Sequence, residues 1–179
     1  MALTTFQQAA GERVLGAGLI ALAAWLGRFD LAWRTVRLHG LPRFMAACLL
    51  AGYFWMAVAG LLVVIGAPLQ GGLLYDAALH AFFLGFVFSM ILGHAPVIFP
   101  AVLQLTPRYH GSFYLHASLL HAALLLRIGG GALGWEAVHR WGGIASALAV
   151  GVFLVNTILR FVLPPAQSET AAPRMAPPL

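Results

Sequence analysis

The sequence predicts an all-α protein that crosses a membrane as a bundle of five helices. Of its 179 residues, 61% are hydrophobic and only 8% are charged, whereas a soluble domain carries about 25% charged residues. The mean hydropathy is +0.90. The apolar residues gather in five segments that approach the roughly 20 residues needed for a spanning helix. We therefore expect residues 1–163 to form a single membrane domain with no separate soluble domain.

The first two apolar segments differ in strength. Residues 14–33 are the weaker segment, because Arg28 and Asp30 shorten its apolar stretch. We expect this segment to be either a short span or a helix that lies in the membrane interface. In the second segment, residues 43–66, the apolar stretch is uninterrupted. Pro68 follows it and is expected to mark the end of the helix.

The third apolar segment, residues 73–104, is too long for an untilted span at about 1.5 Å per residue. We expect it to kink near Pro96 and Pro100, because proline removes a helical hydrogen bond. A run of three glycines is expected to end the fourth span. The remaining expected elements are two spans at 111–129 and 137–163 and a disordered, Pro- and Ala-rich tail at 164–179.

Arginines set the expected orientation, because positively charged residues near span ends favour the cytoplasmic side. All ten basic residues are arginine; seven fall on the side that holds the 28–43 connection and three on the other. We therefore expect a multi-pass protein of a prokaryotic inner membrane, with its N-terminus outside and its C-terminus in the cytoplasm. The +5 net charge is spread over span ends and does not indicate nucleic acid. The expected partners are the lipid bilayer and either further copies of the chain or a larger membrane complex.

Four of the seven histidines lie inside expected spans, where ionisable side chains are costly and indicate a functional site. These are His80, His94, His116 and His121. At about 100° per residue, His94 lies only about 40° from His80, with the small Val87 between them on the same face. This leaves room for a flat ligand. Asp76 lies one turn before His80 and is placed to accept an imidazole N–H and orient the ring.

The depths of two histidines predict a haem site between neighbouring helices. His80 and His121 lie about 10 and 12 Å from the same end of antiparallel spans. Our leading hypothesis is a haem b with these two axial ligands, because neutral imidazole binds haem iron and a porphyrin suits an apolar slot. His94 is a second candidate ligand and His116 a further one. Arg127 is placed to pair with a haem propionate, although snorkelling to lipid headgroups explains its position equally well.

Other chemistries lack their sequence motifs. The chain has no P-loop, HExxH or CxxC motif, and no short His spacing marks a copper site, so copper is less favoured than haem. No catalytic residue stands out; if the protein is an enzyme, we expect an oxidoreductase. Two alternatives stay open. The histidines could form hydrogen bonds across helices in a non-enzymatic accessory subunit, or they could line the polar path of a small transporter or channel.

Part of the third segment carries a family resemblance. The stretch HAFFLGFVFSM, followed by glycine and then prolines, resembles the haem-binding helix of haem–copper oxidase subunit I. It also resembles the NnrS family of multi-span haem proteins linked to the nitric oxide response. The resemblance covers residues 79–104 and implies His80 as a haem ligand, with His94 as the second candidate. It further implies electron transfer, or redox chemistry or sensing related to nitric oxide or oxygen. The chain has fewer spans than the oxidases and lacks their copper-site residues.

Overall fold

A computed structural model describes residues 2–104 and 109–162, and all regular structure in these ranges is helical. The expected all-α helix bundle is thereby confirmed. The elements are α1 (Ala2–Phe29), α2 (Ala32–Thr35), α3 (Leu41–Gly66), α4 (Gly72–His80), the π-helix η1 (Ala81–Val87), α5 (Phe88–Leu103), α6 (Phe113–Ala132) and α7 (Glu136–Val162). Helices α4, η1 and α5 form one continuous rod. Within the described ranges, five helical segments are long and apolar enough to cross a membrane, as expected for a multi-pass membrane protein.

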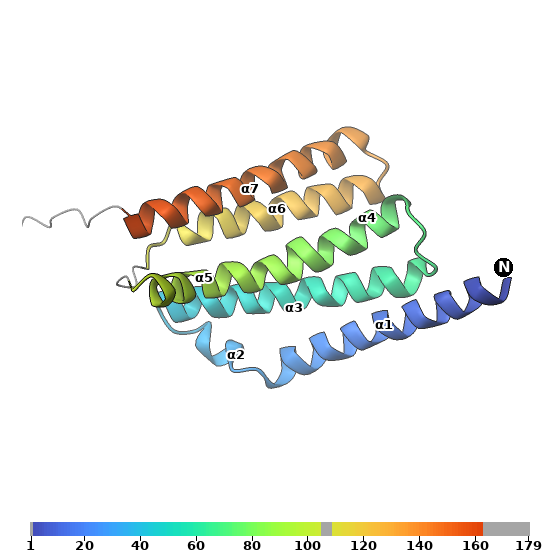
Figure 1. The fold of residues 1–179 in the computed structure, drawn as a ribbon, viewed down its shortest axis with the longest axis horizontal. Coiled ribbons are helices and arrows are strands. Elements are labelled where there is room, and N and C mark those ends of the chain that lie inside the picture. The colour runs from blue at the N-terminus through green and yellow to red at the C-terminus, as the bar shows by residue number, and fades with distance from the viewer. Residues whose placement is uncertain (1, 105–108, 163–179) are drawn as a thin grey trace, which may run out of the picture.

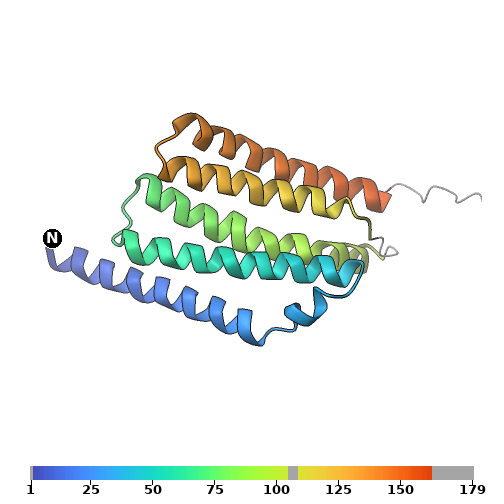
Figure 2. The same ribbon diagram turned by 180° about the vertical axis from the view of Figure 1, so that it is seen from behind.

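The five long helical segments lie side by side in chain order (Figure 1). The view from behind gives the same order, with α1 at one edge, α7 at the other and the α4–η1–α5 rod in the middle (Figure 2). The most extensive packing is between α3 and the rod, followed by that between α6 and α7 and that between α1 and α3. We call the end where α1 begins the N-terminal end of the bundle; it also holds the α3–α4 and α6–α7 connections. The opposite, C-terminal end holds α2 and the end of α7.

The first span is longer than the sequence predicts. The expectation of a short segment at 14–33 is wrong, because α1 begins at Ala2 and its apolar span covers Thr4–Phe29. The preceding residues are rich in alanine, glutamine and other good helix formers. The helix ends just before Asp30, whose Oδ1 accepts the backbone N–H of Ala32 at 2.6 Å. The polar residues that precede residue 14 therefore continue the helix towards the N-terminus and do not interrupt it.

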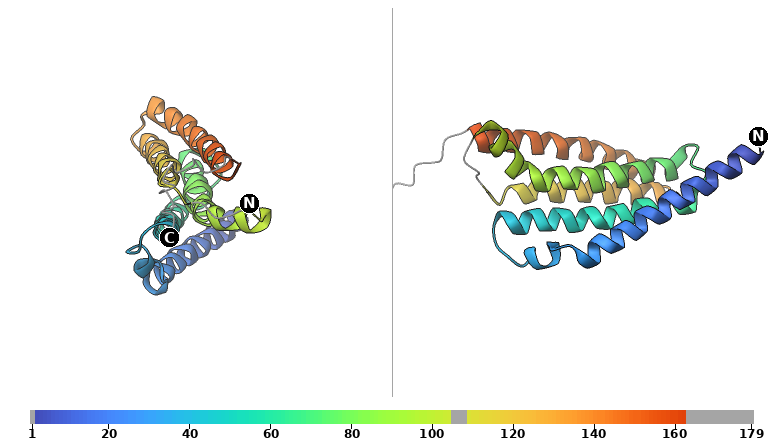
Figure 3. Two further views of the ribbon diagram at one scale, coloured as in Figure 1. Left: turned by 90° about the vertical axis from the view of Figure 1, so that its left-hand side faces the viewer. Right: turned by 60° about the horizontal axis from the view of Figure 1, so that its bottom comes forward.

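The third span has an irregularity that the sequence does not predict, in addition to the expected bend near its prolines. Helix α5 continues through Pro96 and Pro100, and its last turns bend away from the bundle axis (Figure 3). The π-helix η1 comes before them. A π turn holds one residue more than an α turn, so it rotates the following residues by about 100° relative to an uninterrupted α-helix. His80 and His94 therefore lie about 140° apart rather than about 40°, and the predicted common face through Val87 does not form.

Glycines set the close contacts between helices. A Cβ on Gly16 would lie 2.6 Å from the carbonyl oxygen of Gly60, and the reverse contact is equally short. On α6, Gly130 lies against the backbone of α7, where a Cβ would come within 2.6 Å of the His139 nitrogen. The glycine run therefore allows α6 to approach α7 and does not end α6 at residue 129 as expected; the helix continues to Ala132. The expected tail at 164–179 lies outside the described residues.

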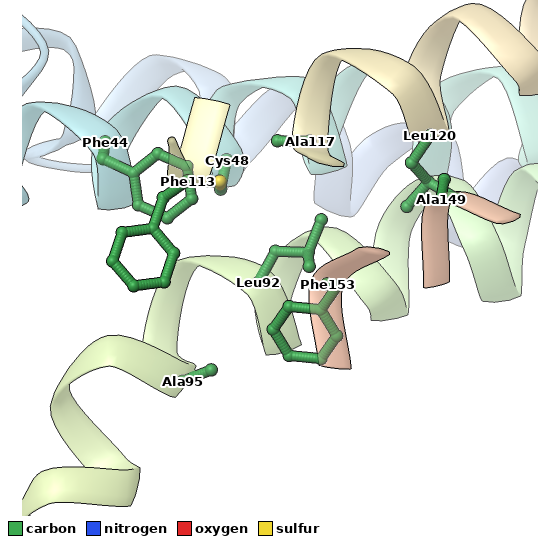
Figure 4. Packing of buried hydrophobic residues seen from close by; sticks show 9 residues of the cluster. All are labelled: Phe44, Cys48, Leu92, Ala95, Phe113, Ala117, Leu120, Ala149 and Phe153. Atoms are coloured by element: carbon green, nitrogen blue, oxygen red, sulfur yellow. The ribbon is translucent and has the colours of Figure 1, made fainter. Parts of the chain in front are cut away.

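The core sits towards the C-terminal end, where α3, α5, α6 and α7 meet (Figure 4). Phe44 of α3 and Phe113 of α6 are fully buried, with ring centroids 5.8 Å apart. Leu92 of α5 and Phe153 of α7 complete the contact between the rod and the last hairpin. Aromatic and branched side chains thus join the α6–α7 hairpin to the rest of the bundle at this end.

The Gly16–Gly60 contact predicts a position-specific loss of stability. In Gly60→Val, the new side chain meets the backbone of α1, so we expect unfolding to become easier by about 2 kcal/mol, in the range of overpacked sites. The thermal unfolding midpoint in detergent measures the change. Gly18→Val is the matched control, because a Cβ there meets nothing within 4 Å. Equal midpoints for the two variants would contradict the close packing of α1 on α3.

Candidate functional site

A charged pair joins the rod to the last hairpin near the N-terminal end. Arg127 of α6 donates from Nη2 to Oδ1 of Asp76 at 2.7 Å and from Nε to Oδ2 at 3.1 Å. The two side chains are only 18% and 27% exposed, respectively. This bidentate geometry matches the planar guanidinium to the carboxylate and gives a strong, directional ion pair. Arg127, a candidate partner for a haem propionate, therefore already has a carboxylate partner within the protein.

Two histidines complete this charged cluster. His80 places Nδ1 3.3 Å from Asp76 Oδ1, and His139 of α7 places Nε2 4.0 Å from Asp76 Oδ2. The Nδ1 of His139 donates to the Arg127 carbonyl oxygen at 2.9 Å. A cavity of about 60 Å³ adjoins the cluster, which is room for ordered water beside the polar groups. Three titratable side chains, from α4, α6 and α7, thus surround one carboxylate.

Hydrogen bonds assign the same tautomer to His80 and His94. Nδ1 of His80 lies 2.8 Å from the carbonyl oxygen of Asp76, and Nδ1 of His94 lies 2.7 Å from that of Met90. A carbonyl oxygen only accepts, so Nδ1 carries the proton in both rings and Nε2 of the neutral ring keeps its lone pair. Histidines that bind metals through one ring nitrogen commonly donate from the other in this way.

His121 has the opposite tautomer. Its Nδ1 lies 3.0 Å from Nε1 of Trp55, and the two rings stack with centroids 6.5 Å apart. An indole N–H only donates, so Nδ1 of His121 is the acceptor and the neutral ring carries its proton on Nε2. Trp55 also packs tightly on η1, since a Cβ at Gly85 would come within 2.5 Å of it. Among the described residues, no hydrogen bond or ion pair joins His121 to His80.

His116 lies in the hydrophobic core. The ring is fully buried among Phe44, Phe113 and Phe153. Its Nδ1 is 3.5 Å from the side-chain amide of Asn156, and its Nε2 has no hydrogen-bond partner among the described residues. Val87, the predicted neighbour of a flat ligand, is half-buried in η1. Among the described residues, neither His116 nor Val87 lines the cavity beside Asp76 or the groove that holds His94.

His94 lines an apolar groove that faces α2 and α3. This His94 groove has a volume of about 390 Å³ and is bounded by residues of α2, α3 and α5. A second hollow, with a volume of about 540 Å³, adjoins it at Asp30 and Leu31 and is lined by Arg28 and Arg34; we call it the arginine hollow. An apolar groove with a free imidazole nitrogen therefore opens onto a cationic surface at the C-terminal end of the bundle.

The structure brings together some of the predicted site residues and separates others. Asp76, His80 and Arg127 share one cluster, whereas His94 lies on the other side of the rod, beside α2 and α3. His139 also belongs to the cluster, although it was not among the predicted site residues. In the described part of the chain, no group of three or more His, Cys, Asp or Glu side chains is arranged to hold a metal ion.

Comparisons with known proteins give a family but no function. The model of a family described as "Domain of unknown function (DUF8744)" matches residues 1–162. Neither the search of curated proteins nor the search of solved structures found a match.

The Asp76–Arg127 pair predicts a loss of stability on removal of one charge. Asp76→Asn leaves the guanidinium of Arg127 without its carboxylate in a half-buried site. We expect a loss of about 2 kcal/mol, less than the 3–5 kcal/mol typical of a fully buried pair. Thermal unfolding in detergent measures it. Glu136→Gln, an exposed carboxylate at the same end, is the control and should change little. Equal effects of the two substitutions would contradict a structural role for the pair.

The hydrogen bonds also predict distinct histidine tautomers. In a sample labelled with ¹⁵N-histidine, His80 and His94 should show Nδ1 protonated, and His121 should show Nε2 protonated. Long-range ¹H–¹⁵N correlation spectra at a pH where the rings are neutral distinguish the two forms. Assignments come from single His→Gln variants. Trp55→Phe removes the donor to His121 and should alter only the signals of that ring; a protonated Nδ1 in wild-type His121 would refute the assignment.

Proposed function

The chain belongs to this family of unknown function, and from its site we propose that it is a multi-span membrane protein that binds haem b in the His94 groove. One observation carries the proposal: His94 lines an apolar groove, and the hydrogen bond from its Nδ1 to the Met90 carbonyl oxygen leaves Nε2 of the neutral ring as the nitrogen with a lone pair. A neutral imidazole nitrogen is a common axial ligand of haem iron. The His94 groove would therefore provide both an iron-binding side chain and apolar surroundings for the porphyrin ring.

The shape and polarity of the groove support this proposal. A volume of about 390 Å³ falls within the roughly 300–1,000 Å³ of small-molecule sites. Most of the lining side chains are apolar, among them Leu41, Met45, Leu49 and Val97. The neighbouring arginine hollow offers Arg28 and Arg34 to the two carboxylates that haem carries. Arginine suits carboxylates because its planar guanidinium donates two parallel hydrogen bonds.

The number of histidines in the groove bears on the kind of function. His94 is the one histidine among the described residues that line it. A haem with a single protein ligand has an open coordination position, where iron binds small diatomic molecules. We therefore favour sensing or redox chemistry of nitric oxide or oxygen over simple electron transfer. The pair His80 and His121 is the alternative ligand set, and it needs His121 to give up its Trp55 hydrogen bond or its Nε2 proton.

We further place the protein in a prokaryotic inner membrane, with the arginine-rich C-terminal end in the cytoplasm. Arg28 in the last turn of α1, Arg34 and Arg37 in the connection, and Arg43 in the first turn of α3 all lie at this end, and such clusters favour the cytoplasmic side. The lipid bilayer and further copies of the chain or a larger complex remain the proposed partners.

An accessory subunit without haem is the second candidate. It is favoured by the Asp76 cluster, where His80 and His139 have polar partners that explain them as packing residues. Such hydrogen bonds between helices are common in membrane bundles. On this alternative, added haem gives no specific spectrum and no histidine variant alters one.

The visible spectrum tests the proposal. Protein purified in detergent after expression with added haem should show a b-type spectrum that changes on reduction and again with carbon monoxide. His94→Ala should reduce bound haem at least about tenfold, as expected for the loss of roughly 1.4 kcal/mol or more of ligand binding. His110→Ala, which changes an exposed histidine, is the control. A spectrum retained in His94→Ala but lost in His80→Ala would move the site to the Asp76 cluster. A colourless wild type would refute haem binding.

A further inference from the structure

A second groove runs between α1 and the rod at the N-terminal end of the bundle. It has a volume of about 330 Å³ and a largely apolar lining that includes Leu15 and Leu19 of α1, Val63 of α3, and Leu79 and Phe82 of the rod. We call it the Glu12 groove, because Glu12 is the one acidic residue among its described lining residues. The flanking side chains Leu15 and Phe83 are 59% and 54% exposed on apolar helices, so the groove faces the lipid.

Glu12 stands at the level of the α3–α4 connection. Helix α1 projects past this connection (Figure 1), so Glu12 lies at the edge of the bundle rather than at the end of its helix. Its Oε2 accepts the backbone N–H of Leu69 at 2.6 Å and its Oε1 accepts from Gln8 at 2.8 Å. Both donors are neutral. Within the described chain, Glu12 forms no ion pair, so no cationic side chain there is in direct contact with its carboxylate.

A positive charge lies beside the same connection. Arg13 is exposed and directs its Nη2 to the carbonyl oxygen of Ala67 at 3.4 Å. Glu12 and Arg13 therefore reach the connection two residues apart, at Leu69 and Ala67. The carboxylate of Glu12 thus lines an apolar groove that opens to lipid, and the guanidinium of Arg13 contacts the same connection two residues away.

We propose that the Glu12 groove binds a zwitterionic aminophospholipid, with an acyl chain in the groove and the headgroup at Glu12 and Arg13. The primary ammonium of the headgroup donates hydrogen bonds to the Glu12 carboxylate, which forms no ion pair within the described chain. The phosphate of the lipid pairs with the guanidinium of Arg13. A choline headgroup has the same net charge but no N–H to donate, so it lacks the first contact. A glycerol headgroup leaves the lipid anionic and offers no cation to Glu12. The headgroup chemistry therefore discriminates among lipids that share the same acyl chains.

Native mass spectrometry of the full chain in detergent tests this site. Phosphatidylethanolamine, phosphatidylcholine and phosphatidylglycerol with identical acyl chains are added in turn. We expect the ethanolamine lipid to be retained about fivefold more than the others, as for one charge-assisted hydrogen bond at a partly exposed site. Equal retention of the three lipids would overturn the proposal.

Two variants separate headgroup from chain recognition. Glu12→Gln keeps an acceptor for Leu69 but removes the charge, so the preference for ethanolamine should disappear; Glu136→Gln, at the same end of the bundle, should preserve it. Val63→Phe fills the groove and should reduce retention of all three lipids. Val155→Phe on the exposed face of α7 is its control. An unchanged preference in Glu12→Gln, with the fold verified by circular dichroism, would refute the site.

Discussion

The half-buried ion pair between Asp76 and Arg127 constrains the rest of the structure. It links the rod to the α6–α7 hairpin near the N-terminal end, while Phe44, Phe113 and Phe153 secure the same hairpin at the other end. In an apolar environment, neither charge is stable without the other, because a lone buried ion has a large desolvation cost. The pair therefore fixes the position of α6 along the rod, and His80 and His139 are oriented by the same two side chains.

Between these polar and aromatic contacts, the helices are held by close backbone approach. Membrane helices gain little from hydrophobic burial, because lipid is as apolar as their side chains, so small residues that permit tight packing are needed. Gly16 and Gly60 do this for α1 and α3, and Gly130 does it for α6 and α7. The grooves lie where bulkier side chains separate the helices. Both grooves border α3, one at each end, so the same packing defines both proposed ligand sites.

Much of the bundle follows from the sequence, because the thickness of the bilayer core sets the length of an apolar helix. The bounds of the four spans between Leu41 and Val162 agree with the predicted bounds to within a few residues. The start of α1 differs from the predicted start, because the residues before the apolar stretch have enough helical propensity to continue the helix. In the site, the four-residue spacing brings Asp76 to His80; that this orients a haem ligand stays a prediction. The partnership with Arg127 is not predictable, because 51 residues separate the two and no local pattern joins them.

The π-helix η1 could not be anticipated either, since AFFLGFV offers no signal beyond one glycine, and any estimate of helical phase assumes a uniform turn. Its consequence concerns how such a chain evolves. Helix α4, which precedes η1, contributes Asp76 and His80 to the charged cluster. Helix α5, which follows η1, contributes His94 to the His94 groove. One residue gained or lost in this segment re-aims all of α5 and leaves α4 in place. A single insertion is therefore sufficient to give two halves of one transmembrane helix separate neighbours, so that each half can acquire mutations without disturbing the other's contacts.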